Sequence, residues 1–392
     1  MSPAEIARSE RADVVVVGGG PAGSATAIRL ARQGLHVVQL ERRVFGAPEN
    51  DRFRSGEGLL PSTMRVLERL GLARDADTWT LQRATGVRIR WPNGDVTLDR
   101  FPDGHRIRTL DRELFDAALW REAGVAGVDG RCNWSVQRLL VEGATVCGVI
   151  ACEPDGESVA LHAPLVVDAG GRNAPSILQF GLRRVEAADD FVVVVLFFDH
   201  VPELRDDVWE MHFFGEGEPS VIQGARIAEG LVRFGLGTSL GLKLGSGLKP
   251  EAFFWQRLRE YPQLEARLRA ARIVRPPYAR ARLGYRTVAI ARSGLLLVGD
   301  ATGYLNPILG DGIFMALRSA ELASEVAMKA FARRDFSMKR LAVYERRWRR
   351  TRWPRVVIGQ VLIAMHRRPQ VVDRLGHVTS LRRMLLNTLM RP

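Results

Sequence analysis

Val14–Gly23, which reads Val-Val-Val-Val-Gly-Gly-Gly-Pro-Ala-Gly, is the stretch that decides the fold of this 392-residue chain. Four β-branched residues predict a buried strand, the glycines predict a tight turn, and Ser24–Arg32 predicts a helix. A second apolar run, Leu35–Leu40, ends in Glu41, eighteen residues after Gly23. This order predicts a dinucleotide-binding unit, because backbone N–H groups and the helix dipole bind a pyrophosphate while the acid accepts a ribose hydroxyl.

Leu295–Gly312, which reads Leu-Leu-Leu-Val-Gly-Asp-Ala-Thr-Gly-Tyr-Leu-Asn-Pro-Ile-Leu-Gly-Asp-Gly, is a second glycine-rich segment far along the chain. Its apolar start predicts a buried strand, and Asp300 follows where a carboxylate can accept a hydrogen bond from a ribityl hydroxyl. Pro307, Gly310 and Gly312 predict a loop that brings backbone N–H groups and a helix N-terminus to the electron-rich end of an isoalloxazine ring. The segment therefore favours a flavin over a nicotinamide.

Four motifs of the chain resemble those of one group of flavoproteins. They are Gly18–Gly23, Arg54–Pro61 (Arg-Ser-Gly-Glu-Gly-Leu-Leu-Pro), Asp168–Arg172 (Asp-Ala-Gly-Gly-Arg) and Gly299–Ile313. The group is the superfamily of FAD-dependent oxidoreductases that includes aromatic hydroxylases, flavin-dependent halogenases and geranylgeranyl reductases, and the resemblance spans residues 13–325. It implies an α/β fold: a Rossmann-like FAD-binding domain with an inserted mixed β-sheet substrate domain and a helical C-terminal tail.

The resemblance also implies where FAD is held. Glu41 would bind the adenosine ribose, Arg54 and Arg112 would lie along the cofactor, and Asp300 would bind its ribityl and pyrophosphate region. The residues expected to contact FAD are Gly18, Gly20, Pro21, Ala22, Gly23, Glu41, Arg42, Arg54, Arg112, Asp300, Pro307, Gly310, Gly312 and Ile313. The electrons would come from NAD(P)H, either directly or through a separate flavin reductase.

The order of the motifs predicts three regions. Residues 11–80, 106–185 and 276–330 would form the FAD-binding domain. Residues 81–105, where alternating apolar residues flank a Pro-Asn-Gly turn, and residues 186–275 would form the substrate domain. Residues 331–392 would form a basic helical C-terminal region.

The composition predicts a cytoplasmic enzyme. The first twelve residues are polar, which argues against a signal peptide, and the longest late apolar run, Val356–Met365, is too short to span a bilayer. Cys132, Cys147 and Cys152 are odd in number and lack a Cys-x-x-Cys spacing, which suits a reducing compartment and predicts no metal site.

Positive charge is concentrated in the C-terminal region. Residues 331–392 hold sixteen Arg and Lys against three acids, a net charge of +13, which equals the net charge of the whole chain. Such a helix can rest on anionic lipid at the periphery of a membrane, dock an acidic partner protein, or pack against the FAD-binding domain as a solvated basic helix. Nucleic-acid binding is not expected, because the flavoenzyme motifs account for the rest of the chain.

Departures from the relatives separate the reactions that the resemblance allows. Ala84 stands where flavin halogenases carry a lysine that delivers hypohalous acid, and their Trp-x-Trp motif is missing. Ser55 stands where geranylgeranyl reductases carry a cysteine, although Asn306–Ile313 resembles the reductase loop. Ala169–Gly171 lacks the aspartate linked to nicotinamide binding in single-component hydroxylases, which favours a separate flavin reductase.

We therefore expect an FAD-dependent monooxygenase that hydroxylates an electron-rich aromatic substrate, small or bound to a carrier or peptide, through a flavin C4a-hydroperoxide. The first alternative is a reductase that saturates an isoprenoid-like double bond; a halogenase and a non-catalytic flavin-binding partner of an acidic protein follow. The loop at Pro307, Gly310 and Gly312 would act through its N–H groups, and His212 as a base, since imidazole titrates near neutrality. Glu57 is a further candidate for an active-site role, and His105 for a second base; structural roles for Glu57 and both histidines stay open.

Overall fold

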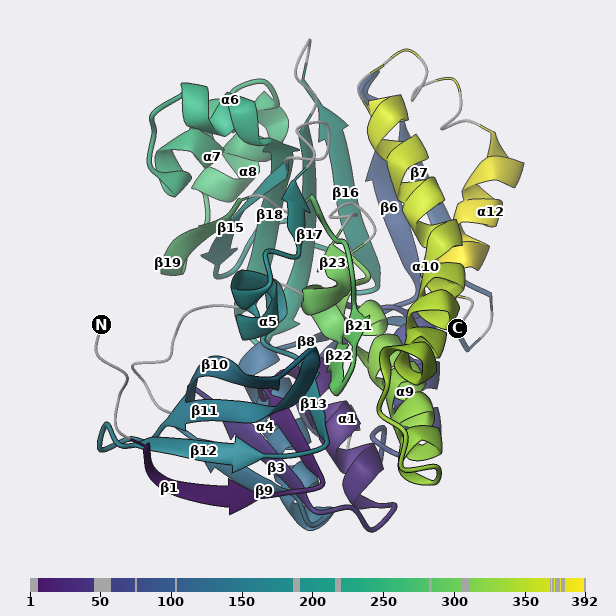
Figure 1. Ribbon diagram of the computed structural model, residues 1–392. Helices are drawn as coiled ribbons and strands as arrows, with labels where there is room; N and C mark the ends of the chain where they lie inside the picture. Colours follow the sequence, from purple (N-terminus) through teal and green to yellow (C-terminus); the bar gives the residue numbers. More distant parts are fainter. Residues whose placement is uncertain are drawn as a thin grey trace.

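Figure 1 shows a computed structural model of the chain, in which one β-sheet region lies above another and the long helices α9 and α10 run along one side. The structure describes residues 6–45, 58–74, 76–102, 104–185, 191–215, 220–281, 284–304, 310–366 and 378–390, with the single residues 368, 370 and 374. The predicted α/β fold with a helical C-terminal region is confirmed.

The first region is built on a mostly parallel sheet in the order β21-β22-β13-β2-β3-β9. Its strands are β2 (Val14–Val17), β3 (Val37–Glu41), β9 (Asp129–Cys132), β13 (Leu165–Asp168), β21 (Ala291–Arg292) and β22 (Leu295–Leu297). All neighbours are parallel except β21 and β22, and β2, β3 and β13 are buried along their whole length. Strands β9, β3, β2, β13 and β22 thus lie in the 3-2-1-4-5 order of dinucleotide-binding folds, and their apolar runs reflect burial on both faces.

Helices and a second sheet cover the parallel sheet. Helices α1 (Pro21–Ala31), α4 (Arg112–Val125) and α9 (Gly312–Phe331) share its core, and α1 packs against both others. The second sheet has the order β1-β12-β11-β10, and β11 packs against β13. Its strands are β1 (Ile6–Arg11), β10 (Ser135–Glu142), β11 (Thr145–Cys152) and β12 (Ser158–His162). One hydrophobic core therefore places the start of α1 and the start of α9 in the same layer.

The second region is a seven-stranded mixed sheet in the order β19-β15-β18-β17-β16-β6-β7. Its strands are β6 (Gly86–Arg90), β7 (Val96–Arg100), β15 (Phe191–Phe198), β16 (Val208–Phe214), β17 (Ser220–Ala228), β18 (Leu231–Ser239) and β19 (Ile273–Arg280). The predicted hairpin forms β6 and β7, and β6 joins the sheet by parallel pairing with β16. Helices α6 (Leu240–Gly245), α7 (Pro250–Leu258) and α8 (Pro262–Arg269) cover one face, which we call the outer face.

Short elements connect the two regions. They are β4 (Gly58–Leu59), α2 (Pro61–Arg69), α3 (Ala76–Trp79), β5 (Thr80–Ala84), β8 (Ile107–Leu110), η2 (Gly171–Asn173), α5 (Pro175–Gln179), β14 (Arg183–Val185), β20 (Tyr285–Thr287), η4 (Gly299–Thr302) and β23 (Gly303–Tyr304). A small core joins Leu60 and Ile107 of these connecting elements to Trp209 and Ala225 of the seven-stranded sheet. The other face of that sheet, the inner face, therefore looks toward the parallel-sheet region.

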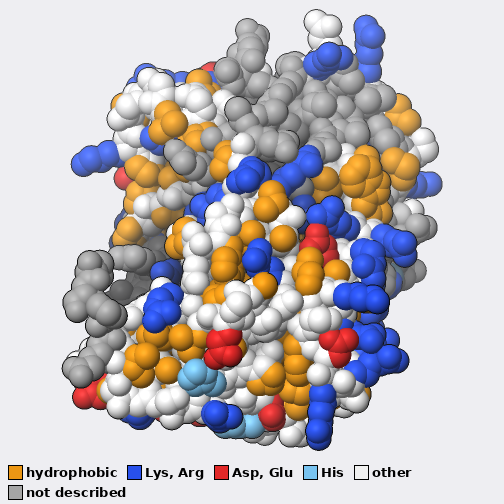
Figure 2. Space-filling view, in the orientation of Figure 1, with side chains coloured by type: hydrophobic (Ala, Val, Ile, Leu, Met, Phe, Trp, Pro, Cys, Tyr) orange, Lys and Arg blue, Asp and Glu red, His pale blue; other side chains and the backbone are white. Residues whose placement is uncertain are grey.

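The basic C-terminal region forms α10 (Met338–His366) and α12 (Thr379–Met390). Helix α10 packs against α9 and β21, and its Leu341, Tyr344 and Trp348 are fully buried. The first part of the tail is therefore packed against the body of the protein. Figure 2 shows Lys and Arg side chains gathered on the side where α9 and the adjoining part of α10 lie. Within the described parts of the chain, no helix is both long and apolar enough to cross a membrane.

Candidate cofactor site

The glycine turn after β2 needs glycine for three different reasons. Gly18 has φ +105°, and a Cβ there would lie 2.6 Å from the carbonyl oxygen of Ala169. A Cβ at Gly23 would lie 2.0 Å from the carbonyl oxygen of Gly18, so helix α1 could not pack this closely against the turn. Gly20 has no atom within 4 Å of such a Cβ, which leaves open space beside its backbone. These are the roles of the three glycines of a dinucleotide site: turn, close approach and packing.

The first turn of α1 leaves its N–H groups available to a ligand. Gly20 is the N-cap and offers no side chain, Pro21 occupies the first turn, and no acid lies there. The first N–H groups of a helix have no partner within it and carry partial positive charge. An anion that approaches the backbone at Gly20 would therefore be bound by N–H groups and dipole together.

Glu41 ends β3 beside the glycine turn, where the sequence places it. The residue is 5% exposed, and its carboxylate accepts hydrogen bonds from the Gly19 N–H at 2.7 Å and Arg43 Nε at 2.9 Å. Arg43 also donates to it from its backbone N–H at 3.1 Å and from Nη2 at 3.3 Å. These four bonds use the roughly four lone-pair positions of the carboxylate, so a ribose hydroxyl would take the place of an Arg43 bond. Arg42, which we expected at the cofactor, is exposed. Arg43 contacts Glu41 instead, and its guanidinium carbon lies 4.9 Å from the Phe45 ring centroid.

Asp300 combines a deep position with an exposed surface. The residue is exposed, yet burial raises the pKa of its carboxyl group, while Arg280, Arg112 and Arg172 oppose the rise electrostatically. Among the described residues, none donates a hydrogen bond to this carboxylate. A deep acid that faces three arginines and has no hydrogen bond of its own is suited to accept hydroxyl groups of a ligand. Arg172 and Arg280 were not predicted; Arg172 lies within a quoted motif, whereas nothing local marks Arg280.

The two glycine-rich segments meet in the structure. A Cβ at Gly299 would lie 2.8 Å from Cβ of Ala22, so the first turn of α1 and the turn after β22 lie against each other. Helix α9 begins at Gly312, its N-cap Asp311 makes no side-chain cap, and Ile313 is buried in the core. Gly310 has φ +63° and open space around it. The predicted residues Arg54, Glu57 and Pro307 lie outside the described residues.

His212 lies away from this site, which does not favour its predicted role as a base. It is 4% exposed and points to the outer face, where Tyr261 OH lies 3.2 Å from its Nδ1 and Glu210 Oε2 lies 3.4 Å from its Nε2. Burial lowers the pKa of His212, and because an ionised carboxylate can only accept, Nε2 donates the hydrogen bond to Glu210. His105 lies on the surface with Arg65 Nη2 2.6 Å from its Nε2. The sequence did not indicate this position of His212, because the alternation of residues along a strand does not show which face of the strand is covered.

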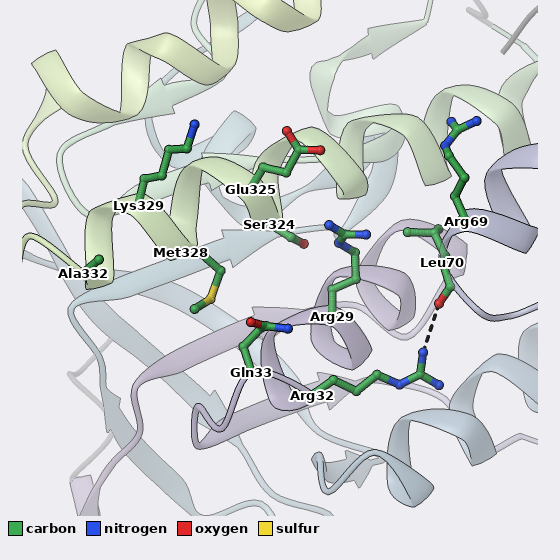
Figure 3. Close-up of a pocket in the computed structure, with 10 residues that line it drawn as sticks. All are labelled: Arg29, Arg32, Gln33, Arg69, Leu70, Ser324, Glu325, Met328, Lys329 and Ala332. Atoms are coloured by element: carbon green, nitrogen blue, oxygen red, sulfur yellow. Dashed lines mark hydrogen bonds between the residues drawn. The ribbon is translucent and has the colours of Figure 1, made fainter.

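A pocket of about 530 Å³ lies elsewhere, between the far ends of α1, α2 and α9 (Figure 3). Arg29, Arg69 and Lys329 line it, each from the last turn of its helix. Helix C-termini carry partial negative charge, which these three cations offset. The pocket is at the end of α1 opposite Gly20, so it is not the cofactor site.

The residues present fit a dinucleotide that carries a pyrophosphate and a hydroxylated chain. The open space at Gly20 and the uncapped start of α1 suit the pyrophosphate, and Glu41 and Asp300 supply acceptors on either side. This combination of an adenosine-side acid and a second acid from a distant segment is the arrangement expected for FAD.

Comparisons with known proteins agree with this geometry. The family described as FAD binding domain matches residues 11–354. The 1H-pyrrole-2-carbonyl-(peptidyl-carrier protein) chlorinase of Pseudomonas fluorescens is 28% identical over 85% of this chain and 79% of its own. The digeranylgeranylglycerophospholipid reductase of Methanothrix thermoacetophila is 29% identical over 86% of this chain and 83% of its own. These relatives carry out different reactions.

A solved structure shows the same fold. The myxobacterial chondrochloren halogenase CndH, an FAD-dependent halogenase, superposes with a TM-score of 0.81 over 91% of this chain and 82% of its own, at 24% identity. At that level of identity the likeness concerns the fold alone.

Proposed function

The chain belongs to the family of FAD-binding-domain proteins and is an FAD-dependent oxidoreductase; on that premise we propose that it is a monooxygenase that hydroxylates an electron-rich aromatic substrate. When bound and reduced, FAD supplies the electrons by which one atom of O₂ enters the substrate and the other leaves as water. The protein's part is to bind FAD through α1, Glu41 and Asp300, orient the substrate and exclude water.

The inner face of the seven-stranded sheet is the observation that supports this proposal. Trp209, Met211 and Phe213 alternate along β16 on the face opposite Phe214, which packs with α7 and α8. The Trp91 and Phe213 rings stack with centroids 5.8 Å apart and planes 8° apart. Trp209 is packed in the small core between the regions, so the half-buried Met211 and Phe213 are the side chains that this strand offers to a flat, apolar substrate.

The positions of the lysines favour hydroxylation over halogenation. The sequence has four lysines, Lys243, Lys249, Lys329 and Lys339. They lie on α6, at the N-cap of α7, in the last turn of α9 and at the start of α10, away from the inner face. Ala84, which stands at the halogenase lysine position, is buried. The chlorination carried out by one relative is therefore not assigned to this chain.

We also propose that a separate flavin reductase supplies the electrons. Asp168 is the acid nearest to the aspartate position of single-component hydroxylases. It is fully buried and accepts hydrogen bonds from the Gly170 N–H at 2.9 Å and the Ser176 N–H at 2.8 Å. Since both of its carboxylate oxygens already accept hydrogen bonds from backbone N–H groups, Asp168 has a structural role. A carrier-bound substrate fits the same scheme, as the name of the chlorinase relative suggests for that protein.

A reductase that saturates an isoprenoid-like double bond is the second candidate. The digeranylgeranylglycerophospholipid reductase relative supports it, and the half-buried Met211 and Phe213 of the inner face would also suit a hydrocarbon. The two reactions differ in the fate of O₂, because only the monooxygenase consumes it to make product.

The test supplies the protein with FAD, a general flavin reductase, NADH and a panel of phenols and indoles under ¹⁸O₂. We expect one ¹⁸O atom per product molecule for at least one aromatic compound. Saturation of an isoprenoid substrate without O₂, and no labelled product, would overturn the proposal in favour of the reductase. Phe213→Ala should raise KM for the labelled reaction more than it lowers kcat, whereas Leu98→Ala, an exposed change on the outer face, should alter neither.

A further inference from the structure

Helix α10 continues its buried face into two arginines. Leu341, Tyr344 and Trp348 are at most 1% exposed, and Arg352 and Arg355 follow at the same three- and four-residue spacing. Arg355 is only 5% exposed, and burial lowers the pKa of both guanidinium groups. Buried arginines are costly unless their charge and N–H groups are used. The groups that Arg352 and Arg355 contact should therefore explain why these side chains are buried.

The contacts follow the second glycine-rich segment in order along the chain. Tyr344 OH donates to the Leu297 carbonyl at 2.7 Å, just before η4. Arg352 Nη1 donates to the Thr302 carbonyl at 3.0 Å, at the end of η4. Helix α10 thus holds the backbone on both sides of Asp300.

Arg355 extends this series to the start of α9. Its Nη1 lies 3.5 Å from Oδ2 of Asp311, its Nη2 lies 3.3 Å from Oγ of Ser62 in α2, and its guanidinium carbon is 3.8 Å from the Phe314 ring centroid. Asp311 is itself 4% exposed. One guanidinium therefore joins α2, α9 and α10 immediately beside the glycines at 310 and 312.

The pairing changes what Asp311 does at the start of its own helix. An aspartate at an N-cap normally accepts a hydrogen bond from the first turn, as Asp111 does in this protein from the Glu113 N–H at 2.9 Å. Asp311 is the N-cap of α9 and makes no such bond. Its carboxylate is turned to Arg355 instead, so the first N–H groups of α9 keep no side-chain cap.

We propose that Arg355, assisted by Arg352, is a positioning residue of the FAD site: it draws the Asp311 carboxylate away from the start of α9 and keeps that helix N-terminus available to the cofactor. The basic C-terminal helix is thereby part of the cofactor site, whatever its exposed arginines bind. The inference rests on FAD binding by this fold and holds for either reaction proposed above.

The experiment measures the Kd of FAD by flavin fluorescence from pH 6 to pH 9, without substrate or reductant. Wild type should vary less than threefold across this range. In Arg355→Met the Asp311 carboxyl has lost the cation that lowers its pKa, while burial still raises that pKa. The ionised fraction of the carboxyl therefore increases as the pH rises. An unpaired negative charge at the start of α9 then weakens binding, and we expect the Kd to rise at least tenfold.

Three further variants separate positioning from simple loss of packing. Asp311→Asn/Arg355→Met should bind FAD with no pH dependence, because the titrating group is gone. Arg355→Lys should also show none, and it keeps the proposal testable if Arg355→Met does not fold. Arg350→Met, an exposed change on the same helix, should match wild type. An equal loss of affinity at every pH in Arg355→Met, an unchanged Kd, or a pH-dependent loss in Arg355→Lys would each overturn the proposal.

Discussion

Glu210 in the seven-stranded sheet and Asp300 in the cofactor site are both deep carboxylates, but the protein treats them in opposite ways. Glu210 is fully buried, with Arg267 Nη2 at 2.6 Å and both Arg88 Nη1 and His212 Nε2 at 3.4 Å. Although burial opposes it, the His212 hydrogen bond and the Arg267 charge lower the pKa of Glu210 to about 2. Asp300 lies near three arginines, but its carboxylate accepts no hydrogen bond from the described residues. Burial raises its pKa.

The difference separates a structural acid from a ligand-binding one. A carboxylate whose oxygens are already paired has little left to offer a substrate, and removing it leaves the surrounding cations without their anion. A carboxylate that is deep, accessible and without hydrogen bonds keeps its acceptor sites for a ligand. His212 looked like a catalytic base in the sequence because it titrates near neutrality, yet it belongs to the first kind of site.

The largest effect should come from Glu210→Gln. The substitution keeps the shape of the side chain but leaves the partly buried Arg267 without its anion, which costs about 3 kcal/mol of the free energy of unfolding. Urea unfolding of the FAD-loaded protein measures it. Asp206→Asn is the control, because Asp206 pairs with Arg226 on the surface and should change stability by less than about 0.5 kcal/mol. Equal unfolding midpoints for Glu210→Gln and wild type would show that Glu210 does not stabilise the fold.

Asp300→Asn should act on the cofactor and leave stability intact. Removing the negative charge relieves its burial and breaks no hydrogen bond within the described residues, so the unfolding free energy of the FAD-free protein should not fall. Loss of an ionic acceptor should raise the Kd of FAD at least tenfold, which corresponds to about 1.4 kcal/mol. Flavin fluorescence titration gives the Kd, with the exposed Asp77→Asn as control. Undiminished FAD affinity would show that Asp300 is not a cofactor ligand.

The sequence pattern predicted those parts of the fold that depend on residues close together in the chain. The valine run, the three glycines and Glu41 lie within one strand–turn–helix–strand unit, so their spacing alone predicts their arrangement. The acid at position 300 was predicted in the same way, from the strand before it and the glycine beside it. The structure adds the contact of Ala22 with Gly299, which joins two segments that the sequence could only suggest belong together.

The parts that the sequence did not predict depend on distant contacts. Arg355 meets Asp311 across 44 positions and Ser62 across 293, and no local spacing marks such a pair. The sequence left open whether the basic tail docks a partner or packs inward, because an amphipathic pattern does not identify its partner surface. For β16, the alternation predicted two faces, but helices α7 and α8 decide which of them is covered.

Lowering the pH should give the smallest change in the free energy of unfolding. The direction of that change tests the same contrast between Glu210 and Asp300. The folded-state pKa of Glu210 is about 2 against an ordinary value of 4.5, so its contribution is complete above pH 5 and is lost as the pH falls toward 2. Between pH 7 and pH 4 the loss is about 1 kcal/mol. His212, whose pKa is lowered, adds a loss of the same sign below its ordinary value of 6.5. Urea unfolding at both pH values should therefore show the gap between wild type and Glu210→Gln narrowing by about 1 kcal/mol. A gap that stays constant or widens on acidification would mean that Glu210 is not held ionised by its neighbours, and the reasoning that divides it from Asp300 would fail.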